Sequence, residues 1–285
     1  MASEVLVGLL TNFITVAIGA LAGVFFFVFR YKSLLKFYGI RRPQDAIRIV
    51  VPRLDVKAGG TAAAIPVFKG YAGPAVAQID YEAAVLLQEQ IRPNIFSWLS
   101  REVRDWISGK LVLAAAVNPV IELAPAPADA PSWHQSRVRT SLILIGGPAY
   151  NAAAGHYQDQ DGAHFAFVRG PDGVRWCAKS LRGRTPGDPG IIESRAVGQE
   201  LGFVQRIIRK DTGAYITMCA GTGAGATLAS AEWLSRNYRQ LHRRCRSGEY
   251  GIMLAFVGVT DPHRRFSGEF STTVLDRMFD GRRDP

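Results

Sequence analysis

AYITMCAGTGAGAT, residues 214–227, is the stretch that decides the fold. The apolar run from Ala214 to Ala220 predicts a buried strand, and it leads directly into a glycine-rich turn. A long helix is expected from about Ala226 to Cys245, because apolar side chains recur on one face and arginines on the other. The order strand, glycine-rich turn, helix is typical of α/β proteins.

Segments on both sides extend this pattern. Apolar runs predict strands at 47–54, 111–117, 140–145, 203–209 and 251–259. Two short runs at 164–168 and 174–179 flank the turn Gly170-Pro171-Asp172-Gly173 and predict a β-hairpin. Helices are expected at 81–91 and 95–107, an exposed loop at 118–135, and a frayed polar tail. We therefore expect an α/β body, a Rossmann-like open sheet with a β-hairpin insertion.

The glycine-rich turn is also the best candidate for a binding site. Glycines allow close backbone approach, and the following helix offers free N–H groups and its positive dipole end to an anion such as a phosphate. The spacing matches neither the dinucleotide-binding fingerprint nor a Walker A loop. A turn that only packs tightly is the alternative. The candidate ligand-binding residues are Gly221, Thr222, Gly223, Gly225 and Thr227.

A second glycine turn, Gly146-Gly147-Pro148, follows the predicted strand 140–145. Ligands of open α/β sheets bind outside the carboxyl ends of the strands, so both turns are expected to face one crevice. There Tyr150 would stack on a base and Asn151 would bind a polar edge. An ordinary Gly-Pro turn is the alternative.

A third candidate lies near Gly70-Tyr71-Ala72-Gly73-Pro74. Asp80 follows this segment and precedes the predicted helix 81–91, where it would bind a ribose hydroxyl or serve as a nucleophile or base. The alternative is that Asp80 only caps its helix.

The N-terminus carries a run without charge, from Val5 to Phe29, which ends at Arg30. As a helix it would be long enough to cross a bilayer, and the cations after it predict that the C-terminal side is cytoplasmic and the N-terminus outside. We therefore divide the chain into a single transmembrane helix of the inner (plasma) membrane (1–29), a basic juxtamembrane linker (30–46) and a cytoplasmic α/β ligand-binding domain (47–285). A buried core helix is the alternative.

Small and polar residues form one stripe along this run. Their spacing of three or four places them on one face, where small side chains let two helices approach closely. We expect the stripe to associate with copies of itself, and membrane lipids to surround the rest. The stripe contains Gly8, Asn12, Thr15, Gly19 and Gly23.

Composition excludes several classes of protein. The cysteines Cys177, Cys219 and Cys245 are odd in number and form no CxxC, which argues against a disulfide framework and a structural zinc site. The five histidines show no metal-ligand spacing, and neither a metal nor a cofactor is expected. The formal charge of +10 suits anionic lipid headgroups or an anionic small ligand. A nucleic-acid partner is not expected, because no basic-aromatic motif is present.

This architecture resembles the membrane-anchored nucleotide-sensing effectors of bacterial antiphage signalling. The resemblance implies a cyclic or linear nucleotide signal, oligomerisation of the N-terminal helix, and cell death or growth arrest as the output. The residues that carry it are Gly19 with Gly23, the turn Gly146-Gly147-Pro148, and the turn from Gly221 to Gly225.

An enzyme is the alternative to such a sensor. Rossmann-like N-glycosidases and deoxyribosyltransferases combine a carboxylate with glycine-rich turns, and here Asp80, Glu82 or Glu232 would supply it. An enzyme requires a carboxylate in the same crevice as both turns, with a raised pKa or a good attack geometry. No catalytic triad or metalloprotease motif is visible, which favours the sensor.

Overall fold

The computed structural model describes residues 2–41, 45–56, 73–92, 119–160, 162–169, 176–181, 191–192, 199–246, 248–258, 271–279 and 282–283. At some positions within helices and strands, only the backbone is described. The predicted helix 95–107 and the predicted strand 111–117 lie outside the described residues.

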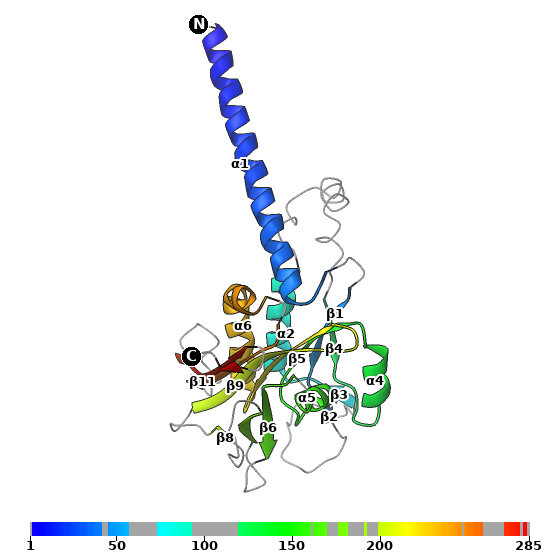
Figure 1. Cartoon of the computed structure of the whole chain (residues 1–285). Helices are drawn as coiled ribbons and strands as arrows, with labels where there is room; N and C mark the ends of the chain where they lie inside the picture. Colours follow the sequence, from blue (N-terminus) through cyan, green and yellow to red (C-terminus); the bar gives the residue numbers. More distant parts are fainter. Residues whose placement is uncertain are drawn as a thin grey trace.

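The chain folds as an α/β protein with a mixed main sheet and a long N-terminal helix (Figure 1). The helices are α1 (Ala2–Phe37), α2 (Gln78–Ile91), α4 (Ala130–Ser136), α5 (Ala152–Gln158) and α6 (Ala224–Cys245). The main sheet contains β1 (Ile47–Val51), β4 (Val120–Leu123), β5 (Ser141–Ile145), β9 (Gln199–Ile208), β10 (Tyr215–Gly221), β11 (Tyr250–Val257), β12 (Ser271–Phe279) and β13 (Arg282–Arg283). Two small sheets contain β2 (Leu54–Val56) with β3 (Gly73–Ala75), and β6 (Phe165–Arg169) with β7 (Trp176–Ser180) and β8 (Ile191–Ile192).

The main sheet has the strand order β13-β12-β11-β9-β10-β5-β1-β4. The four strands β4, β1, β5 and β10 run parallel, and the remaining strands extend the sheet in antiparallel pairs. The predicted α/β class is therefore confirmed. The antiparallel pair β6 and β7 forms the predicted hairpin insertion.

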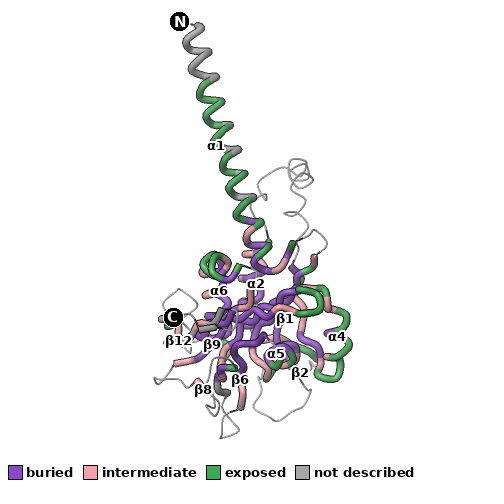
Figure 2. Tube along the Cα trace, viewed as in Figure 1, coloured by how far each residue is buried: buried purple, intermediate pink, exposed green. Residues whose placement is uncertain are grey.

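Helices cover the sheet on two faces (Figure 1). On one face α2, α6 and the end of α1 bury the larger apolar cluster, which includes Leu35, Leu87 and Leu234. On the other face α5 and the small sheet of β6 bury a second cluster around Phe165 and Phe203. Figure 2 shows this buried centre in purple, with the sheet inside it.

Strand order reverses between β1 and β5. The chain leaves β1 through α2 to reach β4 on one side, and it leaves β5 through α5, on the opposite face, toward β10. The loops that follow β1 and β5 therefore diverge at one edge of the parallel strands, the usual position of a ligand in open α/β sheets. We call this edge, where the parallel strands end, the carboxyl edge.

The predicted transmembrane helix is not supported. Among the described residues, none of the helices combines the length and the apolar character that a membrane crossing requires, so this part of the predicted fold is wrong. The last turns of the same helix belong to the core of the body, where Tyr31, Leu34, Leu35 and Phe37 are buried.

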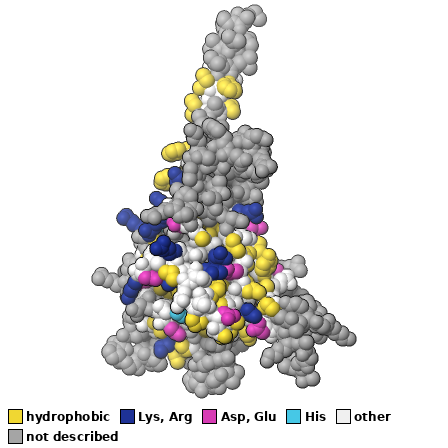
Figure 3. Space-filling model, turned by 90° about the vertical axis from the view of Figure 1, so that its right-hand side faces the viewer, with side chains coloured by type: hydrophobic (Ala, Val, Ile, Leu, Met, Phe, Trp, Pro, Cys, Tyr) yellow, Lys and Arg dark blue, Asp and Glu magenta, His cyan; other side chains and the backbone are white. Residues whose placement is uncertain are grey.

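The rest of α1 projects away from the body (Figures 1 and 2). Its described side chains before Tyr31 are exposed, and they include large apolar groups such as Phe13, Phe25 and Phe29. Phe25, for example, is 75% exposed. Figure 3 shows such hydrophobic side chains on the projecting segment.

A buried arginine joins the end of α1 to the body. Arg206 in β9 is fully buried, and its guanidinium donates hydrogen bonds to the carbonyl oxygens of Phe37 (3.1 Å), Arg246 (3.2 Å) and Gly248 (2.9 Å). The same group lies over the rings of Tyr215 and Tyr250, at 4.8 and 4.9 Å from their centroids. Carbonyl dipoles and aromatic faces thus take the place of a carboxylate partner.

Regular elements appear in segments where the sequence predicted none. The proline-rich segment 118–135 contains the edge strand β4 and the helix α4, whose second residue is Pro131. The tail, predicted to be frayed, forms β12, which pairs with β11 along the edge of the sheet. Both strands lie at or near sheet edges, where few buried apolar residues mark a strand in the sequence.

Candidate functional site

The two glycine-rich turns, which the sequence predicts to face one crevice, are neighbours at the carboxyl edge. The Gly146 amide donates to the carbonyl oxygen of Cys219 over 2.9 Å. A Cβ atom built on Gly147 would lie 3.9 Å from the carbonyl oxygen of Gly221. The ends of β5 and β10 are therefore in direct contact at the two turns.

Glycine is required at two of these positions. Gly146 has a φ of +84°, and a Cβ there would lie 2.7 Å from the ring of Pro52. A Cβ on Gly221 would lie 2.5 Å from the backbone nitrogen of Thr227, so only glycine lets α6 begin this close to β10. Both residues thus have a structural reason to be glycine, independent of any ligand.

Asn151 joins neighbouring strand ends and has no group left for a ligand. It is fully buried, and its amide nitrogen donates to the carbonyl oxygens of Ile145 (2.8 Å) and Val50 (3.2 Å). Its side-chain oxygen accepts from the amide of Ala154 and so caps α5. Asn151 therefore joins the ends of β1 and β5 at the point where strand order reverses.

Tyr150, the neighbour of Asn151, is placed very differently. Its side chain is 64% exposed at this edge, and its carbonyl oxygen accepts from the Arg53 amide over 2.9 Å. The ring is thus presented to solvent on a loop held by hydrogen bonds at both ends, which is consistent with the predicted stacking role.

The predicted hydroxyl donors are already used within the turn. The Thr222 hydroxyl bonds to the backbone of Leu201, and the Thr227 hydroxyl donates to the carbonyl oxygen of Gly223 over 3.1 Å. Gly223 is the N-cap residue of α6, and Gly225 lies in its first turn.

Glu200 occupies the N-terminus of α6. The sequence predicts that this helix end binds the anionic group of a ligand. Its Oε2 accepts a hydrogen bond from the Ala226 amide over 3.0 Å. A Cβ on Gly223 would lie 2.9 Å from either oxygen of this carboxylate. Burial raises the pKa of Glu200, and the Ala226 hydrogen bond offsets part of that rise. Glu200 is thus the main functional candidate that sequence reasoning missed.

Asp80 lies in the first turn of α2 rather than at its cap, because the N-cap residue is Ala77. The Asp80 side chain is buried, and burial raises its pKa to about 6. Since α2 runs back from the loop after β1, its first turn lies near the carboxyl edge. A cavity of about 280 Å³ opens close by, at the ends of β1 and β4, and Val51, Pro74, Tyr81 and Leu123 are among its lining residues.

The other predicted carboxylates take part in local contacts. Glu82 accepts a hydrogen bond from Gln78 on the exposed side of α2. Glu232 forms an ion pair with Arg236 one turn later in α6, and burial raises its pKa. Neither residue lies in a glycine turn.

The predicted association stripe lies on the projecting part of α1. Asn12, Thr15, Gly19 and Gly23 are exposed, and a Cβ on either glycine would meet no atom within 4 Å. The Thr15 hydroxyl donates to the carbonyl oxygen of Thr11. At Gly8 the structure describes only the backbone.

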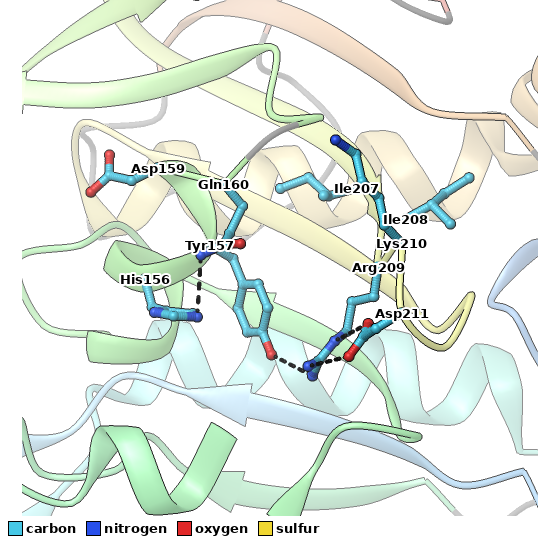
Figure 4. A pocket seen from close by; sticks show the side chains of 9 residues that line it. All are labelled: His156, Tyr157, Asp159, Gln160, Ile207, Ile208, Arg209, Lys210 and Asp211. Atoms are coloured by element: carbon cyan, nitrogen blue, oxygen red, sulfur yellow. Dashed lines mark hydrogen bonds and ion pairs between the residues drawn. The ribbon is translucent and has the colours of Figure 1, made fainter. Parts of the chain in front are cut away.

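A second cavity, of about 440 Å³, lies at the opposite edge of the sheet, where β9 turns into β10 (Figure 4). There the Arg209 guanidinium donates to the Tyr157 hydroxyl (3.2 Å) and pairs with Asp211 (3.3 Å). His156 lines this cavity and stacks on buried His134, with 3.9 Å between ring centroids. Cations and carboxylates are mixed here, so this cavity has no strong preference for an anion.

No group of three or more His, Cys, Asp or Glu within the described ranges is arranged to hold a metal ion. Comparisons of the chain with protein-family models, with curated proteins and with solved structures gave no match.

Proposed function

We propose that this protein is a sensor that binds a nucleotide-type ligand at the carboxyl edge. The observation that carries the proposal is the contact between the two glycine turns after β5 and β10, with Gly146 bonded to Cys219, beside the point where strand order reverses between β1 and β5. Ligands of open α/β sheets bind outside the carboxyl ends of the strands, and glycine, which has no side chain, lets a ligand reach main-chain atoms there.

Each part of the ligand has a candidate partner. The exposed ring of Tyr150 would stack on the base. The first-turn amides of α6 beyond Glu200, at Ala224 and Gly225, would face the anionic group. The cavity beside Tyr81 would receive the remainder of a larger ligand.

In this proposal α1 transmits the ligand signal by associating with copies of itself. Its exposed apolar side chains favour burial against another helix, and Gly19 and Gly23 permit close approach. Arg206 ties the end of α1 to β9, the strand that also carries Glu200, so a shift of β9 would reach α1. Such an effector would resemble those of antiphage signalling, with growth arrest as the output.

A nucleoside-processing enzyme is the second candidate, and one observation favours it. Glu200 is a carboxylate with a raised pKa at the glycine turn itself, and buried Asp80 has a pKa of about 6. Carboxylates of this kind suit general acid-base or nucleophilic work on a glycosidic bond.

The test is a thermal-shift screen of the full chain with NAD, ADP-ribose, cyclic mononucleotides and cyclic oligonucleotides. The full chain is needed because truncation before residue 44 would remove Tyr31, Leu35 and Phe37 from the core. A ligand at a hundred times its Kd adds about 2.7 kcal/mol to the free energy of unfolding. A stabilising compound recovered intact by chromatography supports the sensor, and one recovered cleaved supports the enzyme. If no compound stabilises the chain, the proposed nucleotide site is wrong.

A further inference from the structure

A third cavity, of about 530 Å³, lies at the edge of the sheet where β5 and β10 begin, opposite the carboxyl edge. Three separate segments form its wall: the chain that leaves α1, the residues that lead into β5, and the turn between β9 and β10. The glycine turns and the cavity beside Tyr81 lie at the other ends of these parallel strands. The third cavity is therefore separate from the proposed nucleotide site.

Three side chains bring hydrogen-bond donors to this cavity: Arg41, Arg139 and Ser141. The Arg41 guanidinium donates to a neutral partner, the Tyr215 hydroxyl, over 2.9 Å. The Arg139 guanidinium forms no hydrogen bond or ion pair with any residue that the structure describes. Ser141 is only 4% exposed, and its hydroxyl oxygen accepts from the Tyr215 amide over 3.3 Å, but no group in the described ranges accepts the hydroxyl proton. All three side chains thus have donors left for a ligand.

The two carboxylates in the same wall already accept hydrogen bonds from the protein. Both oxygens of Asp211 accept from the Arg209 guanidinium, over 3.4 and 3.3 Å, as Figure 4 shows. Asp45 accepts from the Arg41 amide over 2.7 Å. With Arg209 included, three arginines stand against two carboxylates, so positive charge is in excess at this cavity.

We propose that this cavity binds a small phosphorylated anion, whose oxygens accept hydrogen bonds from Arg41, Arg139 and Ser141. Phosphate oxygens are strong acceptors, and the planar guanidinium group matches them with paired N–H groups. The volume lies within the range of small-molecule sites, about 300–1,000 Å³, so an organic group fits beside the phosphate. This inference is independent of the proposed function, since it concerns another edge of the sheet.

The site lies close to the attachment of α1. Gly39 follows the helix, and a Cβ atom built on it would lie 2.7 Å from the Ser141 hydroxyl oxygen. The guanidinium groups of Arg41 and Arg206 both lie over the ring of Tyr215, at 5.6 and 4.8 Å from its centroid. A bound phosphate therefore joins the segment after α1 to the start of β5, and should stabilise the attachment of the helix.

Pyrophosphate is the probe for the first test, because it carries phosphate oxygens without a base or a sugar. Titration calorimetry and thermal melts of the full chain would be made at constant ionic strength, with sodium chloride as the balancing salt. We expect saturable binding, and a rise in melting temperature that sodium chloride alone does not give. The absence of saturable binding overturns the proposal.

A variant assigns the bound anion to this cavity. Arg139→Gln removes a cation without a partner among the described residues, so the melting temperature of the free protein should not change. We expect the affinity for pyrophosphate to fall at least about tenfold, because hydrogen bonds between charged groups are lost.

The matched control is Arg243→Gln on α6, which removes the same charge from an exposed side chain that does not line the cavity. Its affinity for pyrophosphate should stay within about twofold of wild type. Equal losses in the two variants would indicate a general effect of net charge. Affinity that survives Arg139→Gln would place the anion elsewhere, and either result overturns the proposal.

Discussion

The guanidinium of Arg206 donates a hydrogen bond to the main-chain carbonyl of Phe37, the last residue of α1, over 3.1 Å. The carbonyls at a helix C-terminus have no partner within the helix and carry its negative dipole end. Arg206, a fully buried cation on the central sheet, supplies both a hydrogen-bond donor for these carbonyls and a positive charge near the negative dipole end. One buried charge, placed among carbonyls and aromatic rings, thus adds to the apolar contacts that attach α1 to the body.

Replacing Arg206 should strongly destabilise the protein. Arg206→Met would leave the buried carbonyls of Phe37, Arg246 and Gly248 without their donor, and we expect the free energy of unfolding to fall by about 3 kcal/mol. Urea denaturation followed by circular dichroism measures this loss. The control is Arg53→Met, whose ion pair with exposed Asp55 should be worth less than about 1 kcal/mol. Equal effects of the two variants would argue against the role of Arg206.

Substitutions at two adjacent residues, Asn151 and Tyr150, should have different effects: the first on stability and the second on ligand binding. Asn151→Ala removes the cap of α5 and the hydrogen bonds to Val50 and Ile145, and should cost about 2–4 kcal/mol of stability. Tyr150→Ala removes an exposed ring and should change stability by less than about 0.5 kcal/mol. If Tyr150 stacks on the base, its loss should weaken binding of the best nucleotide about tenfold. Thermal melts and calorimetry distinguish the two effects, and unchanged binding in Tyr150→Ala would remove the stacking role.

The effect on stability of the positive φ of Gly146 can be tested by comparison with a second glycine, Gly213. Alanine at a left-handed position costs about 1–2 kcal/mol, and at Gly146 the added Cβ would also collide with Pro52. Gly213 has a φ of +69° but no atom within 4 Å of its built Cβ. Gly146→Ala should therefore be more destabilising than Gly213→Ala in the same urea titration. Similar losses would show that the contact with Pro52 relaxes without cost.

The His134–His156 stack predicts a loss of stability in acid. Burial lowers the pKa of His134 to about 4, and nearby His156 and Arg209 contribute to the shift. The unfolded chain binds a proton near pH 6.5 while the folded protein resists protonation until about pH 4. The contribution of His134 is therefore complete above pH 6.5, and up to about 3 kcal/mol is lost as the pH falls to 4.

Comparing wild type with His134→Phe isolates this effect, since phenylalanine keeps a ring in the stack. We expect the variant to gain stability relative to wild type as the pH falls from 6.5 to 4. The comparison also cancels Asp80, whose raised pKa acts in the opposite sense: its contribution is complete below pH 3.8 and is lost as the pH rises through about 6. A constant difference between the two proteins across this range would contradict the predicted shift.

Much of the body was predictable because its signals are local. The run 214–227 contains strand, turn and helix within a few residues, and β10 and α6 form there. Gly146 and Gly221, predicted as ligand-binding residues, both stand where a tight turn after a buried strand needs glycine. The interpretation of Asn151 as a ligand contact was not supported, because its side chain is fully used by hydrogen bonds to Val50, Ile145 and Ala154.

The position of Glu200 beside the glycine turn could have been predicted from the pairing of two predicted strands. The hairpin formed by 203–209 and 214–220 was predicted, and its register pairs Gly202 with Gly221. Continuing that register by two residues places Glu200 opposite Gly223. The pairing of these strands thus implied the position of Glu200, but this prediction required the assumption that the pairing continues into the turn.

The sequence by itself determined the α/β class and the two glycine turns, because periodicity and backbone sterics act over a few residues. It also suggested a membrane span at 5–29, which the described helices do not support. Only the tertiary structure decided that the end of α1 belongs to the core, that Arg206 caps it, and that Glu200 accepts a hydrogen bond from the Ala226 amide at the start of α6. Each of these contacts joins residues far apart in the chain, and burial and hydrogen bonding between such residues exist only once the sheet has brought them together.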